Sequence, residues 1–290
     1  MNNQRREFLM KTTLLSLAGA LGSSSLLANP LTAKSKRIGL QLYSLRNDIK
    51  DNVAGVLESV AKIGYKTLEA ANYDNGKIYG MSPSDFKSTV GDLGMEMTSA
   101  HVGGPRGYSK ETHAEAMDWW KKAAEDHAEA GAKYLIKPSM PIPTTLGELR
   151  MWCDYYNQVG EVTKARGLMF GFHNHSREFE KIEGEIMFDF MLKNTDPQLF
   201  CMELDVYWCQ EGGYNPVDYL KKYKGRFPLL HIKDEKEIGQ SGKMDFKAIF
   251  KAAYAQGMKE YFVEVERYNH PPIESVRQSY EFLAKASFVK

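Results

Sequence analysis

The chain has 290 residues, of which 43% are hydrophobic and 26% charged, and its formal net charge at pH 7 is +1. This composition is typical of a globular protein with a sizeable core, so folding requires neither a disulfide framework nor a structural metal. The near-neutral charge gives no reason to expect nucleic acid or an anionic membrane as a partner.

The first element in chain order is an expected export signal with a short linker, residues 1–33. A twin-arginine pattern, Gln4-Arg5-Arg6-Glu7-Phe8-Leu9-Met10-Lys11, precedes a modest apolar run that ends near Ala28. The run is too short and too rich in small residues for a membrane span, so we expect no stable membrane anchor. Cleavage after Ala28 or after Ala33 fits equally well. We therefore expect a periplasmic or exported protein, with an uncleaved amphipathic tail as the alternative.

Beyond residue 33, helix-like stretches repeatedly end in a glycine, and a short apolar run follows each. The glycines are Gly64, Gly94, Gly131, Gly167, Gly225 and Gly257. Glycine adopts the left-handed conformation that ends many helices. A seventh end is predicted at Asn194-Thr195-Asp196-Pro197, where asparagine would take that conformation and proline would stop the helix.

Eight short strands are predicted, over residues 37–43, 67–71, 96–102, 134–138, 169–174, 200–206, 228–233 and 261–266. Amphipathic stretches at helical spacing, such as Leu146–Arg166, lie between them. The alternation favours a parallel sheet, and eight units over residues 37–290 predict a single (β/α)₈ TIM barrel of the α/β class. An open doubly wound sheet would need a glycine-rich loop after the first strand, where this chain has Tyr43-Ser44-Leu45-Arg46. Three long irregular stretches are expected as loops at the barrel mouth, residues 72–82, 102–110 and 179–186.

Barrel strands alternate inward and outward side chains, so inward residues near each strand's end point into the mouth. Seven of the eight strands offer a charged residue or a histidine there, and the inward set is Gln41, Tyr43, Glu69, His101, Lys137, His173, His175, Glu203, Asp205, His231, Lys233, Glu264 and Glu266. Unpaired buried charges are costly, so a purely structural role explains this cluster poorly. Mixed carboxylate and imidazole ligands indicate a divalent metal: Mn²⁺, Co²⁺, Zn²⁺ or Mg²⁺. The remaining histidines, His113, His127 and His270, are expected on the surface.

With these residues in place, the chain resembles the xylose-isomerase-like TIM barrels, the sugar phosphate isomerase/epimerase superfamily, over residues 37–290. The resemblance is carried by Gly64-Tyr65 with Leu68-Glu69, Phe172-His173-Asn174-His175, Glu203-Leu204-Asp205, His231-Ile232-Lys233-Asp234 and Val263-Glu264-Val265-Glu266. It implies that His173, Asp205, His231 and Glu264 hold the metal, with Glu266 as a rival to Glu264. Many members have glutamate where this chain has His173, and histidine where it has Trp208. Epimerisation by two metal-bound carboxylates is therefore in doubt.

The resemblance also implies the chemistry: removal of a proton beside a sugar carbonyl, through a metal-stabilised enediolate. Glu264 or Glu266 is the candidate base, and His101 or Lys233 the candidate acid or oxyanion partner. The residues expected to bind the sugar are Gln41, Tyr43, Glu69, Lys137, His175 and Trp208.

The reaction and the substrate are left as alternatives. An isomerase or epimerase and a 3-keto-glycoside lyase/hydratase both fit the cluster, and the second needs only one base. Export favours an unphosphorylated sugar or glycoside. A non-catalytic, exported sugar-binding barrel is the alternative of another class, and a homo-oligomer is compatible with every reading.

Overall fold

The computed structural model describes residues 36–105 and 108–290, so the predicted export signal lies outside the described residues. Eight parallel strands close into a barrel in the order β1-β12-β11-β10-β7-β6-β5-β2, which is chain order around the ring. They are β1 (Gly39–Gln41), β2 (Thr67–Ala70), β5 (Glu96–His101), β6 (Tyr134–Lys137), β7 (Met169–His173), β10 (Phe200–Asp205), β11 (Leu229–Ile232) and β12 (Glu260–Val263). The predicted (β/α)₈ barrel is confirmed.

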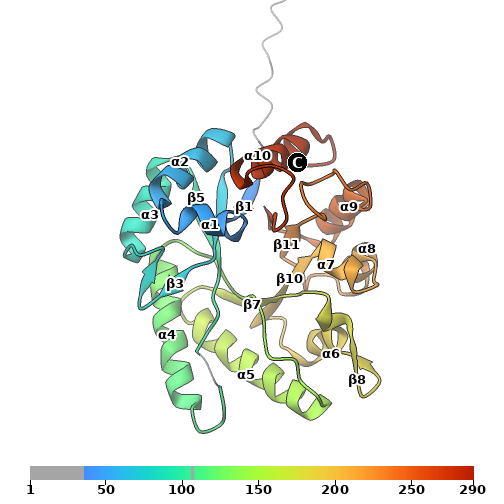
Figure 1. The fold of residues 1–290 in the computed structure, drawn as a ribbon. Helices are drawn as coiled ribbons and strands as arrows, with labels where there is room; N and C mark the ends of the chain where they lie inside the picture. Colours follow the sequence, from blue (N-terminus) through green and yellow to red (C-terminus); the bar gives the residue numbers. More distant parts are fainter. Residues whose placement is uncertain (1–35, 106–107) are drawn as a thin grey trace, which may run out of the picture. The chain divides into compact units, whose positions relative to one another are not determined.

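Helices surround the strands as an outer ring (Figure 1). They are α1 (Arg46–Ile49), α2 (Val53–Ile63), α3 (Pro83–Asp92), α4 (His113–Glu129), α5 (Leu146–Lys164), α6 (Met187–Asn194), α7 (Val206–Glu211), α8 (Pro216–Lys222), α9 (Phe246–Gln256) and α10 (Pro272–Lys285), with 3₁₀ turns η1 (Leu42–Leu45) and η2 (Arg177–Phe179). Gly64 and Gly257 end α2 and α9 at φ 119° and 98°, as predicted. In residues 36–105 and 108–290, no helix combines the length and apolar character needed to cross a bilayer.

The predicted left-handed end at Asn194 is wrong. Helix α6 does end at this residue, but Asn194 is not among the non-glycine residues with positive φ, and Thr195 is extended at φ −118° and ψ 142°. Arg226 supplies the cap instead, because its guanidinium donates to the Leu192 carbonyl and, at 2.7 Å, to Thr195 Oγ1. A cation that satisfies the last carbonyls removes the need for a left-handed turn.

Two of the three loops expected to be irregular contain short antiparallel hairpins, which corrects that expectation. Strand β3 (Tyr73–Asp74) pairs with β4 (Lys77–Ile78), and β8 (Lys181–Ile182) pairs with β9 (Glu185–Ile186). The connecting residues, Asn75-Gly76 and Glu183-Gly184, all have positive φ. Two such residues in succession make the tight turn whose twist matches a hairpin.

The barrel interior is layered, with apolar residues towards the N-terminal ends of the strands. Ile136, Cys201, Leu229 and Phe262 form a buried cluster there. A Cβ on Gly171 would lie 2.7 Å from Cys201 Sγ, so only glycine leaves room for this layer. Because side chains two residues apart share a face, Glu203, His231 and Glu264 follow Cys201, Leu229 and Phe262 into the interior. The polar cluster therefore rests on an apolar floor.

Candidate metal centre and active site

Four side chains meet at the C-terminal end of the barrel: His173, Asp205, His231 and Glu264, called here the quartet. They come from β7, β10 and β11 and from the residue after β12, and one ligand atom of each lies within 4.8 Å of all the others. All four are buried. His231 Nδ1 lies 3.2 Å from Glu264 Oε2, and His173 Nε2 lies 3.4 Å from Asp205 Oδ2. This is the set that the family resemblance implies, and it could hold one metal ion.

The electrostatics of the quartet suit a divalent cation. Burial, reinforced by the nearby His231 and His101, holds the pKa of His173 well below its usual range, so its ring is neutral, the form that binds metals. Burial also raises the pKa of Asp205 to about 7, against the opposing charge of Lys233. For Glu264 burial acts in the same upward direction, but Lys233 and His231 outweigh it and keep its pKa well below normal. Crowded carboxylates beside a neutral imidazole favour a positive ion between them.

A second group of side chains, Glu69, His101 and Glu203, adjoins the quartet at His231, and Glu69 and Glu203 are fully buried. Glu69 Oε2 is 2.6 Å from His231 Nε2, and Glu203 Oε2 is 2.8 Å from His101 Nε2. Gln41 Nε2 donates to Glu69 Oε2 at 2.7 Å, and Ser99 Oγ donates to Glu69 Oε1 at 2.6 Å.

The environment of Glu69 keeps it ionised and turns His231 towards the quartet. Burial alone would raise the pKa of Glu69, but the adjacent His101 and His231 lower it. Burial, with the charge of Glu69, instead raises the pKa of Glu203 to about 7. Although ligand atoms of Glu69, His101, Glu203 and His231 are also close enough for a metal, Glu69 is already surrounded by N–H and O–H donors. We infer that it accepts a hydrogen bond from His231 Nε2–H and leaves Nδ1 for the quartet.

A cavity of about 420 Å³, called here the mouth cavity, opens onto the quartet. Its lining includes Tyr43, His101, His173, His175, Glu264 and Glu266. Behind its wall, Lys233 Nζ lies 2.7 Å from Glu264 Oε2 and 2.9 Å from Glu266 Oε2. Burial opposes the charge of Lys233, but Glu264 and Asp205 raise its pKa, so it stays cationic. Lys233 is thus a fixed positive charge between two carboxylates.

The other predicted sugar-binding residues lie around this cavity, except Lys137, which lines an adjoining cavity and not this one. Tyr43 is 42% exposed at the rim, whereas Gln41 and Glu69 are fully buried behind His231 and do not line the cavity. The Trp208 ring lies 5.7 Å from that of His175 and 5.3 Å from Lys233 Nζ, behind the lining residues.

Two supporting residues of the site were given no role from the sequence. Asn174 holds Asp205 by its backbone, because its Oδ1 accepts from Asp205 N at 3.1 Å and its Nδ2 donates to Asp205 O at 3.3 Å. Glu203 binds His101. The period-two spacing from Asp205 marks Glu203 as inward, but its partner lies 102 residues away in the chain.

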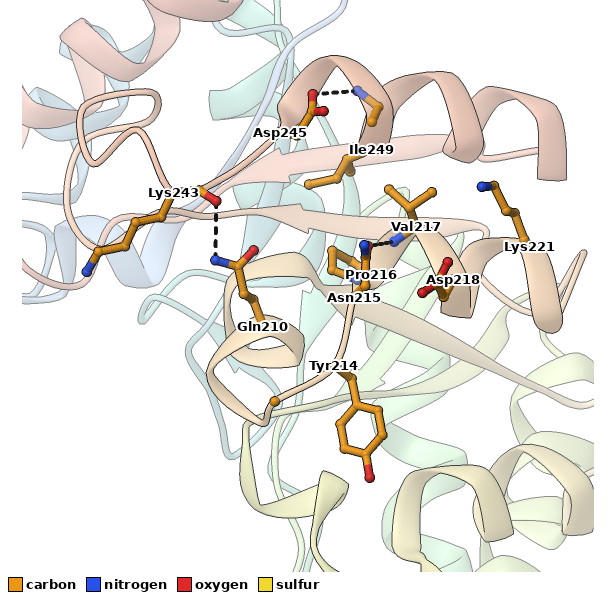
Figure 2. A pocket seen from close by; sticks show the side chains of 12 residues that line it. Gln210, Tyr214, Asn215, Pro216, Val217, Asp218, Lys221, Lys243, Asp245 and Ile249 are labelled. Carbon is orange, nitrogen blue, oxygen red and sulfur yellow. Dashed lines mark hydrogen bonds between the residues drawn. The ribbon is translucent and has the colours of Figure 1, made fainter.

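A larger cavity, about 560 Å³, lies outside the barrel between the starts of α8 and α9 (Figure 2). Its polar side chains serve the local backbone. Asn215 Oδ1 accepts from Val217 N, Asp245 Oδ1 accepts from Ala248 N, and Gln210 Nε2 donates to the Lys243 carbonyl. Among the described residues, neither group that could hold a metal includes a residue of this cavity. We therefore assign it no chemistry.

The closed barrel and the histidine–carboxylate cluster at its mouth define a TIM-barrel enzyme. The model of the xylose isomerase-like TIM barrel family matches residues 57–286, so the chain belongs to this family. It is an enzyme of that superfamily, and its reaction class is open.

Three known proteins are similar to this chain over most of its length. It is 24% identical over 242 residues to inosose dehydratase of Geobacillus kaustophilus (strain HTA426), a match that covers 74% of this chain and 76% of the relative. A sugar phosphate isomerase/epimerase of Parabacteroides distasonis ATCC 8503 is 41% identical, with a TM-score of 0.84, over 88% of this chain and all of the other. A second such structure from that organism is 36% identical, with a TM-score of 0.85, over 90% of this chain and 97% of the other.

Proposed function

We propose that this enzyme uses a divalent metal to remove a proton from the carbon beside a carbonyl of an unphosphorylated sugar or glycoside. The observation that carries the proposal is that His173 and Glu264 of the quartet line the mouth cavity together with Glu266. A metal bound by the quartet would grip the carbonyl oxygen and stabilise the negative charge that develops on it.

The side chains around the mouth cavity take separate roles. Glu264 is held by His231 and Lys233 and is a ligand, whereas Glu266, which pairs with Lys233 alone and is 25% exposed at the cavity, is the base. Burial opposes the charge of His101, but Glu69 and Glu203 raise its pKa, so a protonated His101 is the proton donor. Lys233 bridges the two glutamates and neutralises part of their charge.

The lining of the mouth cavity supports an unphosphorylated substrate. Within the described residues, neither lysine nor arginine contributes to it. A phosphate group is normally bound by such cations or by a helix N-terminus behind a glycine-rich loop. Hydroxyl groups instead suit the histidine and carboxylate atoms present.

An isomerase or epimerase reaction is our first assignment, and elimination from a 3-keto-glycoside is the second. The second is favoured by one observation: outside the quartet, Glu266 is the one carboxylate that lines the mouth cavity in the described part of the chain. Elimination needs one base, whereas epimerisation by carboxylates needs one on each face of the carbon. The similarity to inosose dehydratase supports elimination, and the similarity to the sugar phosphate isomerase/epimerases supports the first assignment.

The test is solvent exchange in D₂O. The metal-loaded protein is incubated with a 3-keto-glucoside or with a free ketose, and NMR follows the proton beside the carbonyl. We expect deuterium at that carbon or loss of the glycosidic group. After the metal is removed, the protein should produce neither change in the sugar. Absence of exchange with every keto sugar, at full metal occupancy, would overturn the proposal.

A further inference from the structure

A second cavity, about 430 Å³, adjoins the mouth cavity. Gly103, after β5, and Ser139, after β6, line both cavities, so the two share a wall. Each volume lies within the range of small-molecule sites. The enzyme therefore offers two adjoining compartments at the barrel mouth.

The two compartments differ in chemistry. Histidines and carboxylates line the mouth cavity, whereas Tyr108, Met140, Trp152 and Tyr155 line the second cavity. The Tyr108 ring stacks on Tyr155 with 3.8 Å between centroids, and Trp152 lies 5.5 Å from Tyr108. Tyr155 is fixed in turn by a 2.7 Å hydrogen bond from Trp120 Nε1. These rings form a rigid platform of the kind that packs against the flat face of another ring.

Lys137 supplies the one ammonium group among the described residues that line the second cavity. Its Nζ donates to the Gly103 carbonyl at 2.5 Å, which places the amine beside the shared wall. Burial lowers the pKa of Lys137 to about 8, so the amine can give up a proton near neutral pH. Among the described residues that line the second cavity there is no carboxylate to neutralise Lys137.

We propose that the second cavity binds the aglycone ring of a glycoside whose keto-sugar ring occupies the mouth cavity, with Lys137 donating to the oxygen that joins the two rings. The proposal rests on the proposed function and deepens it, because it makes the substrate a glycoside and not a free sugar. In the elimination, Glu266 takes the proton beside the carbonyl, and that electron pair forms the C=C bond. The C–O bond to the aglycone breaks, and the leaving oxygen takes a proton from Lys137.

The test compares the binding of methyl and phenyl glucosides, as both anomers, by calorimetry. These probes carry no ketone, so binding is measured without turnover. We expect one phenyl anomer to bind at least about tenfold more tightly than its methyl counterpart, as burial of one aromatic ring against others predicts. Trp152→Ala should remove this preference, and Tyr108→Ala provides a second variant on a loop. Trp119→Ala, the same change at a partly buried residue outside the second cavity, should keep it.

Failure of this proposal is distinguishable from failure of the metal chemistry. His231→Ala should lose metal but keep the phenyl preference, because His231 does not line the second cavity. Equal or unmeasurable binding of methyl and phenyl glucosides overturns the aglycone site, as does a preference that survives both Trp152→Ala and Tyr108→Ala. Lys137→Met, with a 3-keto phenyl glucoside as substrate, should lower kcat and leave metal content unchanged. An unchanged kcat removes Lys137 from the proton transfer.

Discussion

His231 Nε2 lies 2.6 Å from Glu69 Oε2, although the two residues are 162 positions apart in the chain. The carboxylate is itself held by Gln41 and Ser99, so the pair is rigid. Its consequence lies on the other side of the ring: a proton kept on Nε2 by Glu69 would leave Nδ1, which lies 3.2 Å from Glu264 Oε2, as the ring atom that could bind a metal.

Glu69→Gln should weaken metal binding by about 10–100-fold, as is typical when a carboxylate behind a ligating histidine is lost. The measurement is metal titration by calorimetry, with the absorption spectrum of the Co²⁺ form as a report on coordination geometry. Glu260→Gln is the matched control, because Glu260 starts β12 at the opposite end of the strand from Glu264. Equal affinity in Glu69→Gln and the wild type would refute the role of Glu69.

Glu266→Gln and Glu264→Gln should separate the base from the ligand. Glu266→Gln should lower kcat by about 10²–10⁴-fold, the usual contribution of a general base, with metal content unchanged. Glu264→Gln should lose metal, because Glu264 belongs to the quartet. Metal analysis and kinetics on the same samples check both expectations. The reverse pattern would exchange the two roles.

Acid should destabilise the protein through His127, which is fully buried with Nδ1 2.7 Å from the Ala123 carbonyl. Burial lowers the pKa of His127 from 6.5 to about 4. The unfolded chain therefore takes up this proton first, and stability is lost as pH falls from about 6.5 to about 4. Relative to His127→Gln, the wild type should lose up to about 3 kcal/mol over that window. Urea unfolding at pH 7 and pH 4 measures it. An equal loss of unfolding free energy between pH 7 and pH 4 in the wild type and in His127→Gln would contradict the role of His127. His270→Gln, a change at an exposed histidine, serves as the control.

The export signal remains a prediction from the sequence, and we propose that residues 1–33 direct the chain to the periplasm. Replacing Arg5 and Arg6 together by lysine should retain the protein in the cytoplasm. Arg37→Lys, an arginine-to-lysine change outside the signal, should leave export unaffected. Cell fractionation with antibody detection decides, and periplasmic recovery of the double variant would refute a twin-arginine route.

The strand pattern was enough to predict the barrel and the set of inward residues at its mouth, whereas the choice of the quartet among them rests on the family resemblance. Period-two alternation is a property of the backbone, so inward residues at strand ends must converge. It could not separate Glu264 from Glu266, because both are inward by alternation. Both glutamates lie beyond the end of β12 at Val263 and line the mouth cavity, and the contact with His231 at 3.2 Å distinguishes Glu264.

Long-range contacts limited the remaining predictions. His127 was expected on the surface, and this was wrong, because Tyr73 of the β3–β4 hairpin packs on its ring with 4.7 Å between centroids. The pattern of polar and apolar residues within α4 could not predict this contact, because the hairpin belongs to an earlier part of the chain. The end of α6 likewise depends on Arg226, more than thirty residues further along the chain.

The metal content of purified His231→Ala tests the central claim most directly. The wild type should carry about one divalent ion per chain, as a single site of four side chains requires. The variant should carry almost none while keeping the circular dichroism of a folded barrel, because His231 belongs to the quartet and contacts both Glu264 and Glu69. Full metal occupancy in folded His231→Ala would contradict the account.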